Sequence, residues 1–299
     1  MIITMRPFTG ASDIERMIAL AYAFPDQYLR SVDLPYRLAS WALDNPHNVC
    51  LWEDEAGDLL GFAIIQLPWR SLDTCAHPAA RDAGIERLML VWATERAQEI
   101  ADESGQPLTL YVDAFEHDAE QLTLLAAYGF VPDQSAMIRM VRSLEDVLPQ
   151  PHLPEGFVLR PIDGMRELRD YVVLHRAAFG AADMTIEWRR RTLRAPQYIP
   201  ELDVVAEAPD GRLAAFCMCW LGPVCGEGYI EPLGVHPDFA GYGLGRAVLL
   251  DGLWRLQAHG ATLAVIDRYE GDEGARALCD ALGFRTRLRT VGYARRFGT

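Results

Sequence analysis

Three glycines at alternate positions lie directly before an apolar run that predicts a helix. They are Gly241, Gly243 and Gly245, in the segment HPDFAGYGLGRAVLLDGL at 236–253. A helix start leaves its first amide N–H groups without partners and carries a partial positive charge, so it can hold an anion. Glycine lets the anion approach the main chain and lets the chain turn where a side chain would clash. The segment therefore predicts a phosphate-binding loop.

Two acidic residues precede this loop on a predicted strand. Glu231 lies four residues before Val235, where its carboxylate could draw a proton from an ammonium group, directly or through water. This makes Glu231 the candidate general base, and the alternative is a surface glutamate that pairs with an arginine. Glu227 is the reserve candidate.

The glycine spacing excludes the two common nucleotide loops. A dinucleotide-binding loop needs Gly-x-Gly-x-x-Gly, but the last position is Arg246 when counted from Gly241 and Val248 when counted from Gly243. A Walker A loop needs Gly-Lys followed by Ser or Thr, and the segment lacks it. The phosphate therefore belongs to another kind of ligand.

Composition limits the possible partners and locations. The chain has 299 residues, half of them apolar, which is enough for two domains with their own cores. The formal net charge of −14 disfavours nucleic acid and mildly favours amine substrates. Six cysteines without paired spacing predict free thiols and no metal site. The longest apolar stretches, such as 59–69, are shorter than the roughly 18 residues that span a bilayer, so we expect a cytoplasmic protein without membrane contact.

The sequence repeats itself at a nearly constant offset. Residues 5–17 match 159–171, 57–65 match 211–219, and 112–130 match 266–284, while His77-Pro78 corresponds to His236-Pro237. We therefore predict an N-terminal copy at 1–145, a proline-rich linker at 146–156 and a C-terminal copy at 157–299.

Each copy reads as the same series of elements. A strand leads into helices, two strands joined by a glycine-containing turn follow, and a further strand enters the His-Pro segment. A helix, a strand, a second helix and a last strand complete the copy. The helix from about Gly245 should bury Leu249, Leu253 and Leu256 and end at His259-Gly260.

Two segments resemble the signature of the GNAT N-acetyltransferase superfamily. EPLGVHPDFAGYGLGRAVL resembles its strand, loop and helix start, and ARALCDALGF resembles its later helix, which ends in Leu-Gly-Phe. The openings MRPF and LRPI are also typical. The resemblance covers nearly the whole chain as two tandem copies, similar to mycothiol-synthase-like two-domain GNAT proteins.

This resemblance implies an α/β fold made of two tandem GNAT acyltransferase folds. Each is expected to be a mostly antiparallel, twisted sheet with a splayed, V-shaped notch, flanked by helices. The implied co-substrate is acetyl-CoA, with its pyrophosphate on the helix start and its pantetheine along the main chain of the strand. The implied acetyl-CoA site comprises Leu233, Gly234, Val235, Ala240, Gly241, Tyr242, Gly243, Leu244, Gly245, Arg246 and Asp272.

Two positions depart from the family pattern. Cys279 stands where the family usually has a tyrosine that acts as general acid, and a thiol could donate a proton but is shorter. The alternatives are a buried core cysteine, protonation by solvent, or the hydroxyl of Tyr242, Tyr269 or Tyr293. Ala240 replaces an arginine or glutamine of the signature, which predicts weaker binding of acetyl-CoA.

The N-terminal copy departs further. In HPAARDAGIER, Arg81 and Gly84 match the signature, but Glu86 replaces the last glycine. A carboxylate there should satisfy the helix-start donors and repel pyrophosphate. In the repeat, Leu72 is the counterpart of Glu231, and Leu125 is the counterpart of Cys279. Neither proton-handling side chain is therefore present, so we expect the N-terminal copy to be a pseudo-domain.

We therefore expect an acetyl-CoA-dependent N-acetyltransferase that acts on an amine of a small molecule, with its active site in the C-terminal copy. The alternatives are a non-catalytic acyl-CoA-binding or regulatory module and a protein-lysine acetyltransferase. The basic run at 187–194 should be a solvated helix face, or could supply an arginine to the CoA 3′-phosphate. The chain could act as a monomer or a homodimer.

Overall fold

The chain forms two compact units. The computed structural model describes residues 2–25, 28, 30–222 and 226–298, so Cys225 lies outside the described residues. Unit 1 comprises Met1–Ile138 with Leu288–Thr299, and unit 2 comprises Arg139–Arg287.

The units differ from the predicted boundaries at the last strand of each copy. Strand β13 (Arg285–Phe297) pairs antiparallel with β5 (Leu108–Phe115) from Thr290 to Phe297, which brings the end of the chain into unit 1. Strand β7 (Met137–Ser143) neighbours β12 (Leu263–Tyr269), so the end of the N-terminal copy belongs to unit 2. The two copies thus exchange their last strands. The bounds 1–145, 146–156 and 157–299 divide the sequence repeat and stay a prediction.

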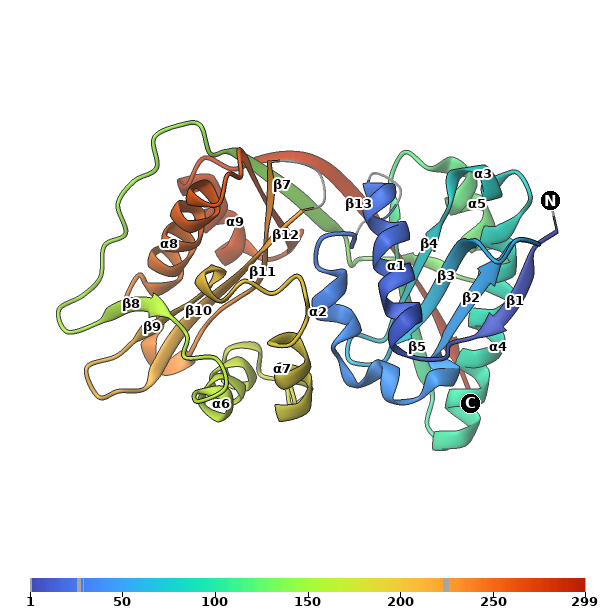
Figure 1. Ribbon diagram of the computed structural model, residues 1–299, viewed down its shortest axis with the longest axis horizontal. Coiled ribbons are helices and arrows are strands. Elements are labelled where there is room, and N and C mark those ends of the chain that lie inside the picture. Colours follow the sequence, from blue (N-terminus) through green and yellow to red (C-terminus); the bar gives the residue numbers. More distant parts are fainter. Residues whose placement is uncertain (1, 26–27, 29, 223–225, 299) are drawn as a thin grey trace. The chain divides into compact units, whose positions relative to one another are not determined.

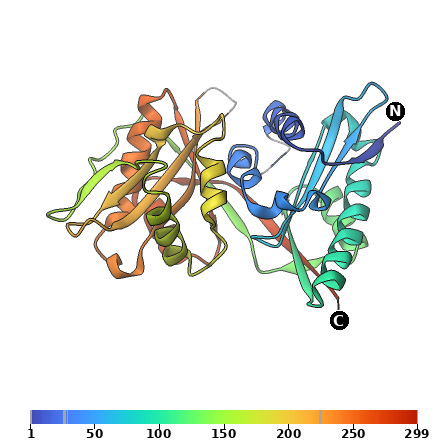
Figure 2. The same ribbon diagram turned by 60° about the horizontal axis from the view of Figure 1, so that its bottom comes forward.

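In unit 1 a sheet is covered by helices on both faces (Figure 1, Figure 2). Its strand order is β1 (Thr4–Pro7), β2 (Val49–Glu53), β3 (Leu59–Gln66), β4 (Ser71–Ala76), β5 and β13, and β6 (Val131–Asp133) pairs with β13. The helices are α1 (Ala11–Ala23), α2 (Leu34–Leu38), α3 (Pro78–Arg81), α4 (Ile85–Ser104) and α5 (Ala119–Ala127). Side chains alternate along β3, so Phe62 and Ile64 pack with α1 whereas Ala63 and Ile65 pack with α4.

Unit 2 repeats this arrangement. Its strand order is β7, β12, β11 (Glu227–Val235), β10 (Leu213–Leu221), β9 (Asp203–Glu207) and β8 (Val158–Pro161). The helices are α6 (Leu168–Phe179), α7 (Ile186–Thr192), α8 (Leu244–Ala258) and α9 (Glu273–Ala281). Helix α8 confirms the helix predicted from about Gly245, because Leu249, Leu253 and Leu256 are fully buried and His259 caps its C-terminus.

The duplication is visible in one repeated cluster of ion pairs. In each unit the arginine of the Arg-Pro pair contacts a carboxylate at the start of the first helix and a carboxylate at the end of the second strand. Arg6 lies 2.6 Å from Asp13 and 2.8 Å from Glu53, and Arg160 lies 2.5 Å from Glu167 and 2.6 Å from Glu207. These partly buried clusters fix the first helix of each unit against its sheet edge.

Within the described ranges, no helix is both long enough and apolar enough to cross a membrane.

Candidate functional site

A notch opens in the sheet of unit 2 beside Glu231. Strand β11 pairs in parallel with β12 from Glu227 to Ile230, and its register with β12 ends there. On its other side β11 continues along β10 as far as Val235. The main chain from Glu231 to Val235 therefore has a sheet edge on the β12 side to which an extended ligand could add.

A β-bulge sets the position of Glu231 at the mouth of this notch. Ile230 lies opposite Cys219 and Leu233 opposite Cys217, so β11 contains one residue more than β10 between these pairs. Pro232 has no N–H to donate to a ladder, which suits it to a bulge. The indole Nε1 of Trp220 donates a 2.7 Å hydrogen bond to the main-chain oxygen of Glu231.

The glycine loop leads from this strand to the start of α8. Gly241 and Gly243 have φ angles of +83° and +75°, which side-chain-bearing residues rarely adopt, and a Cβ at either would meet nothing within 4 Å. Gly243 occupies the N-cap position of α8 and has no side chain that could accept a hydrogen bond from the first turn. A Cβ on Gly245 would lie 3.2 Å from Val235 Cγ2, so helix and strand approach closely here. The loop therefore offers the amides of a helix start beside open space, an arrangement that holds anions.

The remaining loop residues surround this helix start. Tyr242 is half exposed and its ring contacts Phe157 and Phe239. Ala240 precedes the glycines, and Leu244 lies between the last two of them. The guanidinium of Arg246 donates to the main-chain oxygen of Ala281 at 3.5 Å. His236 accepts a 3.1 Å hydrogen bond from the amide of Asp238 through Nδ1, so it shapes the turn before the loop.

Two further members of the predicted acetyl-CoA site have structural partners. Gly234 lies on the notch edge between Leu233 and Val235, and a Cβ there would come within 2.7 Å of the Phe216 ring, so this position requires glycine. Asp272 caps α9, because its carboxylate accepts a 2.8 Å hydrogen bond from the amide of Ala275.

The proton-handling candidates lie in different surroundings. Cys279 is 1% exposed on α9, and burial raises the pKa of its thiol to about 11, which agrees with the alternative of a core cysteine. Glu227 lies in the fully paired part of β11, where its carboxylate accepts a 3.1 Å hydrogen bond from Arg287. Tyr269 is exposed, whereas Tyr293 belongs to unit 1, where it pairs with Val112. The role of Tyr293 as an alternative proton donor to the C-terminal site stays a prediction.

The basic run at 187–194 is only partly the solvated face that the sequence predicts. Arg190 and Arg191 pair with Glu187 at the surface, as expected. Arg189, however, is fully buried in an ion pair with Asp203, whose side chain is also fully buried. Trp188 and Thr192 are buried on the same face of α7 as Arg189. The apolar side chain of Trp188 was the signal in the sequence that this face is buried.

Around this buried pair lies an aromatic cluster on the α6 side of the sheet. The guanidinium carbon of Arg189 lies 3.7 Å from the centre of the Tyr171 ring, and Tyr198 donates a 2.8 Å hydrogen bond to Asp203. His175 stacks on Phe216 with ring centres 5.6 Å apart. Burial, reinforced by nearby arginines, lowers the pKa of His175 to about 3, so its imidazole is neutral.

Tyr171 connects this cluster electrostatically with Glu231. Burial raises the pKa of the Tyr171 phenol, and the negative charges of Asp203 and Glu231 act in the same direction. The Tyr171 hydroxyl is buried and has no hydrogen-bond partner among the described residues. Sequence reasoning missed Tyr171, Arg189 and Asp203, because their roles depend on contacts between elements.

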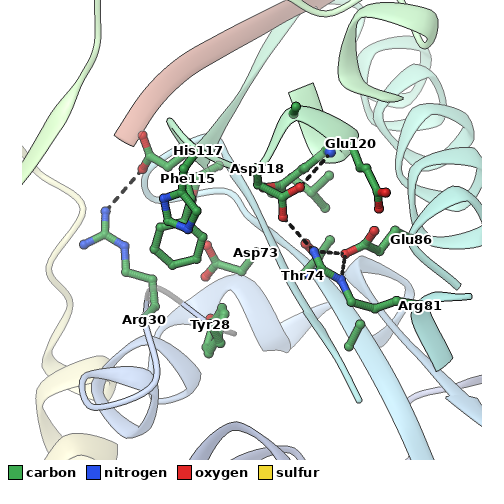
Figure 3. Close-up of a pocket in the computed structure, with 16 residues that line it drawn as sticks. Tyr28, Arg30, Asp73, Thr74, Arg81, Glu86, Phe115, His117, Asp118 and Glu120 are labelled. Atoms are coloured by element: carbon green, nitrogen blue, oxygen red, sulfur yellow. Dashed lines mark hydrogen bonds and ion pairs between the residues drawn. The ribbon is translucent and has the colours of Figure 1, made fainter. Parts of the chain in front are cut away.

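In the corresponding loop of unit 1, charged side chains form ion pairs with one another. Gly84 is the N-cap of α4 with a φ of +79°, as Gly243 is for α8, but Arg81 donates a 2.8 Å hydrogen bond to Glu86 and lies 2.7 Å from Asp118 (Figure 3). We expected the Glu86 carboxylate to bind the helix-start amides, and it pairs with Arg81 instead. The loop keeps the signature arginine, but two carboxylates already neutralise it.

An uncapped, glycine-opened helix start beside a splayed sheet edge defines a class of protein, the acyl-CoA-dependent acyltransferases. A model of the acetyltransferase (GNAT) family matches residues 170–284. A mycothiol acetyltransferase of Kineococcus radiotolerans is 33% identical over 224 residues, which are 73% of this chain and 70% of that protein. The chain belongs to the GNAT acetyltransferases, in their two-domain form, and acetyl-CoA is the co-substrate of this family.

Other proteins agree with this assignment. A mycothiol acetyltransferase of Thermobispora bispora is 29% identical over 254 residues, with 81% of each chain covered. A tandem GNAT protein from the clavulanic acid biosynthesis pathway covers 100% of this chain and 99% of its own, with a TM-score of 0.68 and 17% identity. A GCN5-related N-acetyltransferase from Sphaerobacter thermophilus covers 98% of this chain and 95% of its own, with a TM-score of 0.67 and 21% identity. At these identities the two solved structures support the fold alone.

Proposed function

We propose that unit 2 carries the acetyl-CoA site and the catalytic centre, and that the acceptor is an amine of a small molecule. The observation that carries the proposal is the position of Glu231, which is the first residue of β11 beyond its parallel pairing and lies on the strand that leads to the glycine loop. The anion site and the candidate base thus share one continuous segment of chain.

In this proposal the start of α8 holds the pyrophosphate. The amides of Leu244, Gly245 and Arg246 belong to the first turn, so their N–H groups and the helix dipole both favour a phosphate there. The free edge from Leu233 to Val235 supplies main-chain groups for the pantetheine arm, and a main-chain N–H on this edge can polarise the acyl carbonyl. When bound, acetyl-CoA supplies the activated acyl carbon.

The residues of the notch handle the protons. The carboxylate of Glu231 takes a proton from the acceptor ammonium, directly or through one water, which frees the nitrogen lone pair for attack on the acyl carbon. As the C–N bond forms and the C–S bond breaks, the nitrogen releases its second proton to solvent, and the leaving sulfur needs a proton. Cys279 is the acid that the sequence names, but its burial favours a core role, so we assign this proton to solvent.

Two observations support a small-molecule amine as the acceptor. The relatives share a name, mycothiol acetyltransferase, that refers to a small molecule rather than to a protein. The net charge of −14 favours a cationic acceptor. A cytoplasmic location belongs to the same proposal. Ala240 and Cys279, at two signature positions, favour the second candidate function, a non-catalytic acyl-CoA-binding module.

Calorimetric titration of acetyl-CoA into the full chain tests the site. We expect one site per chain, which Gly245→Glu abolishes because the carboxylate places a negative charge where the pyrophosphate binds. Gly245→Gln is the matched control, since it adds the same bulk without the charge, and it should weaken binding less. Two sites of equal strength, or one site that Gly245→Glu leaves intact, would contradict the assignment to unit 2.

If binding is confirmed, a screen of small amines separates the two candidate functions. A transferase releases CoA thiol in the presence of an acceptor, and Glu231→Gln suppresses this release without a change in acetyl-CoA affinity. A binding module takes up acetyl-CoA but releases no thiol with any amine.

A further inference from the structure

Unit 1 contains a cavity of about 430 Å³ at its own notch (Figure 3). Its walls come from β4, the end of β5, the end of α3, the start of α4 and the start of α5, and Tyr28 and Arg30 close one side. Because β4 and β5 pair only at Ser71 and Tyr111, the strands separate directly afterwards and leave this space.

The charges of this cavity do not suit CoA. Among the described residues, five carboxylates line it, those of Asp73, Glu86, Asp113, Asp118 and Glu120. Two guanidinium groups of the same part of the chain line it, those of Arg30 and Arg81, and a third, that of Arg37, lies behind Asp73 in a buried ion pair. A polyphosphate would therefore be repelled, whereas a cation would be attracted.

Glu120 is exposed, and among the other carboxylates of the cavity Asp113 has the weakest internal compensation. Asp73 accepts hydrogen bonds of 2.8 and 3.1 Å from Arg37, and Asp118 shares Arg81 with Glu86. The one ion pair of Asp113 within the described part of the chain is a contact of 3.4 Å from Arg30. Burial raises the pKa of Asp113, which means that its charge lacks full stabilisation inside the protein.

The equivalent aspartate of unit 2 is held quite differently. The repeat aligns Asp113 with Asp267, which accepts hydrogen bonds of 2.9 and 2.8 Å from Arg139 and one of 2.8 Å from the hydroxyl of Tyr229. The side chain of Asp267 is 1% exposed, whereas that of Asp113 is 27% exposed and lines the cavity. In unit 2 protein donors occupy the carboxylate of Asp267, whereas in unit 1 the carboxylate of Asp113 is accessible to a ligand in the cavity.

A second, independent feature points to a ligand. Tyr28 lines the cavity and is 4% exposed, yet its hydroxyl has no hydrogen-bond partner among the residues that the structure describes. A buried hydroxyl without a partner costs stability, and a polar group in the cavity would remove that cost.

We propose that this cavity binds a small organic ammonium compound, whose N–H groups donate to the Asp113 carboxylate and to the Tyr28 hydroxyl oxygen. Figure 3 shows the Arg30 contact on one side of the cavity and the group of Arg81, Glu86 and Asp118 on the other, with Asp73 between them. Carboxylates at both ends suit an extended dication best. The site is separate from the proposed acetyl-CoA site and does not depend on it.

The test uses 1,4-diaminobutane as probe and 1,4-butanediol as its uncharged counterpart, titrated into the full chain by calorimetry. We expect the diamine to bind and the diol not to bind. Asp113→Asn should weaken diamine binding about tenfold or more, because a hydrogen bond to a charged group is lost. Asp58→Asn, an exposed aspartate of the same unit, removes the same charge and should leave the affinity unchanged.

Tyr28→Phe keeps the test decisive if Asp113→Asn fails to fold. Its hydroxyl has no partner to lose among the described residues, so the midpoint of thermal unfolding should not fall, while diamine binding should weaken about threefold to tenfold. Absence of diamine binding, equal binding of the diol, or binding that both variants leave unchanged would overturn the proposal. So would a loss of binding in Glu231→Gln but not in Asp113→Asn, because the diamine would then occupy unit 2.

Discussion

Glu231 and Leu72 hold the same place in the two units. Each is the first residue of its strand beyond the last parallel pair, which is Ile230 with Ile266 in unit 2 and Ser71 with Tyr111 in unit 1. The duplication has thus kept the notch in both copies but has put a carboxylate at this strand position in only one. The difference between the copies lies in side-chain chemistry on a shared backbone.

Glu231→Gln is expected to lower kcat about 10²- to 10⁴-fold, the usual contribution of a general base, with little change in acetyl-CoA affinity. Steady-state kinetics with an amine acceptor measures this, and the acidic limb of the pH–rate profile should disappear. Glu227→Gln is the matched control, because Glu227 pairs with Arg287 in the closed part of the strand. A kcat within threefold of the wild type for Glu231→Gln would exclude it as the base.

Arg189→Met is expected to destabilise the protein by about 3–5 kcal/mol, because it leaves the buried carboxylate of Asp203 without its partner. Chemical denaturation gives the free energy of unfolding. The double variant Arg189→Met with Asp203→Leu should recover much of the loss, since neither charge then remains buried. Arg190→Met, at the surface next to it, should change stability by less than about 1 kcal/mol.

Protonation of His175 should weaken the folded protein at acidic pH. Its pKa is lowered to about 3 in the folded state and is near 6.5 when the chain unfolds, so the unfolded chain binds the extra proton in this window. The stability it contributes is complete above pH about 6.5 and falls by up to about 1.4 kcal/mol per unit as the pH drops toward 3.

His175→Phe should flatten this slope of unfolding free energy against pH, because the aromatic neighbours Phe179 and Phe216 can accept a phenyl ring. His152→Phe, at an exposed position, should keep the slope. An unchanged slope in His175→Phe would mean that other groups produce the acid sensitivity.

Gly252→Ala should destabilise unit 2 by about 1–3 kcal/mol through overpacking. The added Cβ would lie 3.0 Å from the sulfur atoms of both Cys217 and Cys219, where α8 crosses β10. Thermal unfolding should show the loss, and combination with Cys217→Ala should restore part of it. A neutral effect of Gly252→Ala would show that the helix can move away from the strand at no cost.

The sequence predicted the features that depend on neighbouring residues or on comparison between the two copies. The repeat, the glycine loop, the start and end of α8 and its buried leucines all follow from local spacing, and the structure confirms them. The family signature depends on the same short segments. For this reason the fold class and the co-substrate could be inferred from the sequence alone.

Only the tertiary structure decided which residues from distant segments meet. The last strand of each copy joins the sheet of the other unit, so Tyr293 belongs to unit 1, whereas the glycine loop belongs to unit 2. Arg189 forms a buried ion pair with Asp203, although its basic run is predicted to be a solvated helix face, and Glu86 pairs with Arg81 and not with the helix-start amides.

The two equivalent aspartates, Asp113 and Asp267, show the physical reason. Their sequence contexts are similar, but one receives an arginine from β7 and the other faces a cavity. A charge acquires its role from the groups that surround it in space, and a single sequence specifies those groups only through the fold.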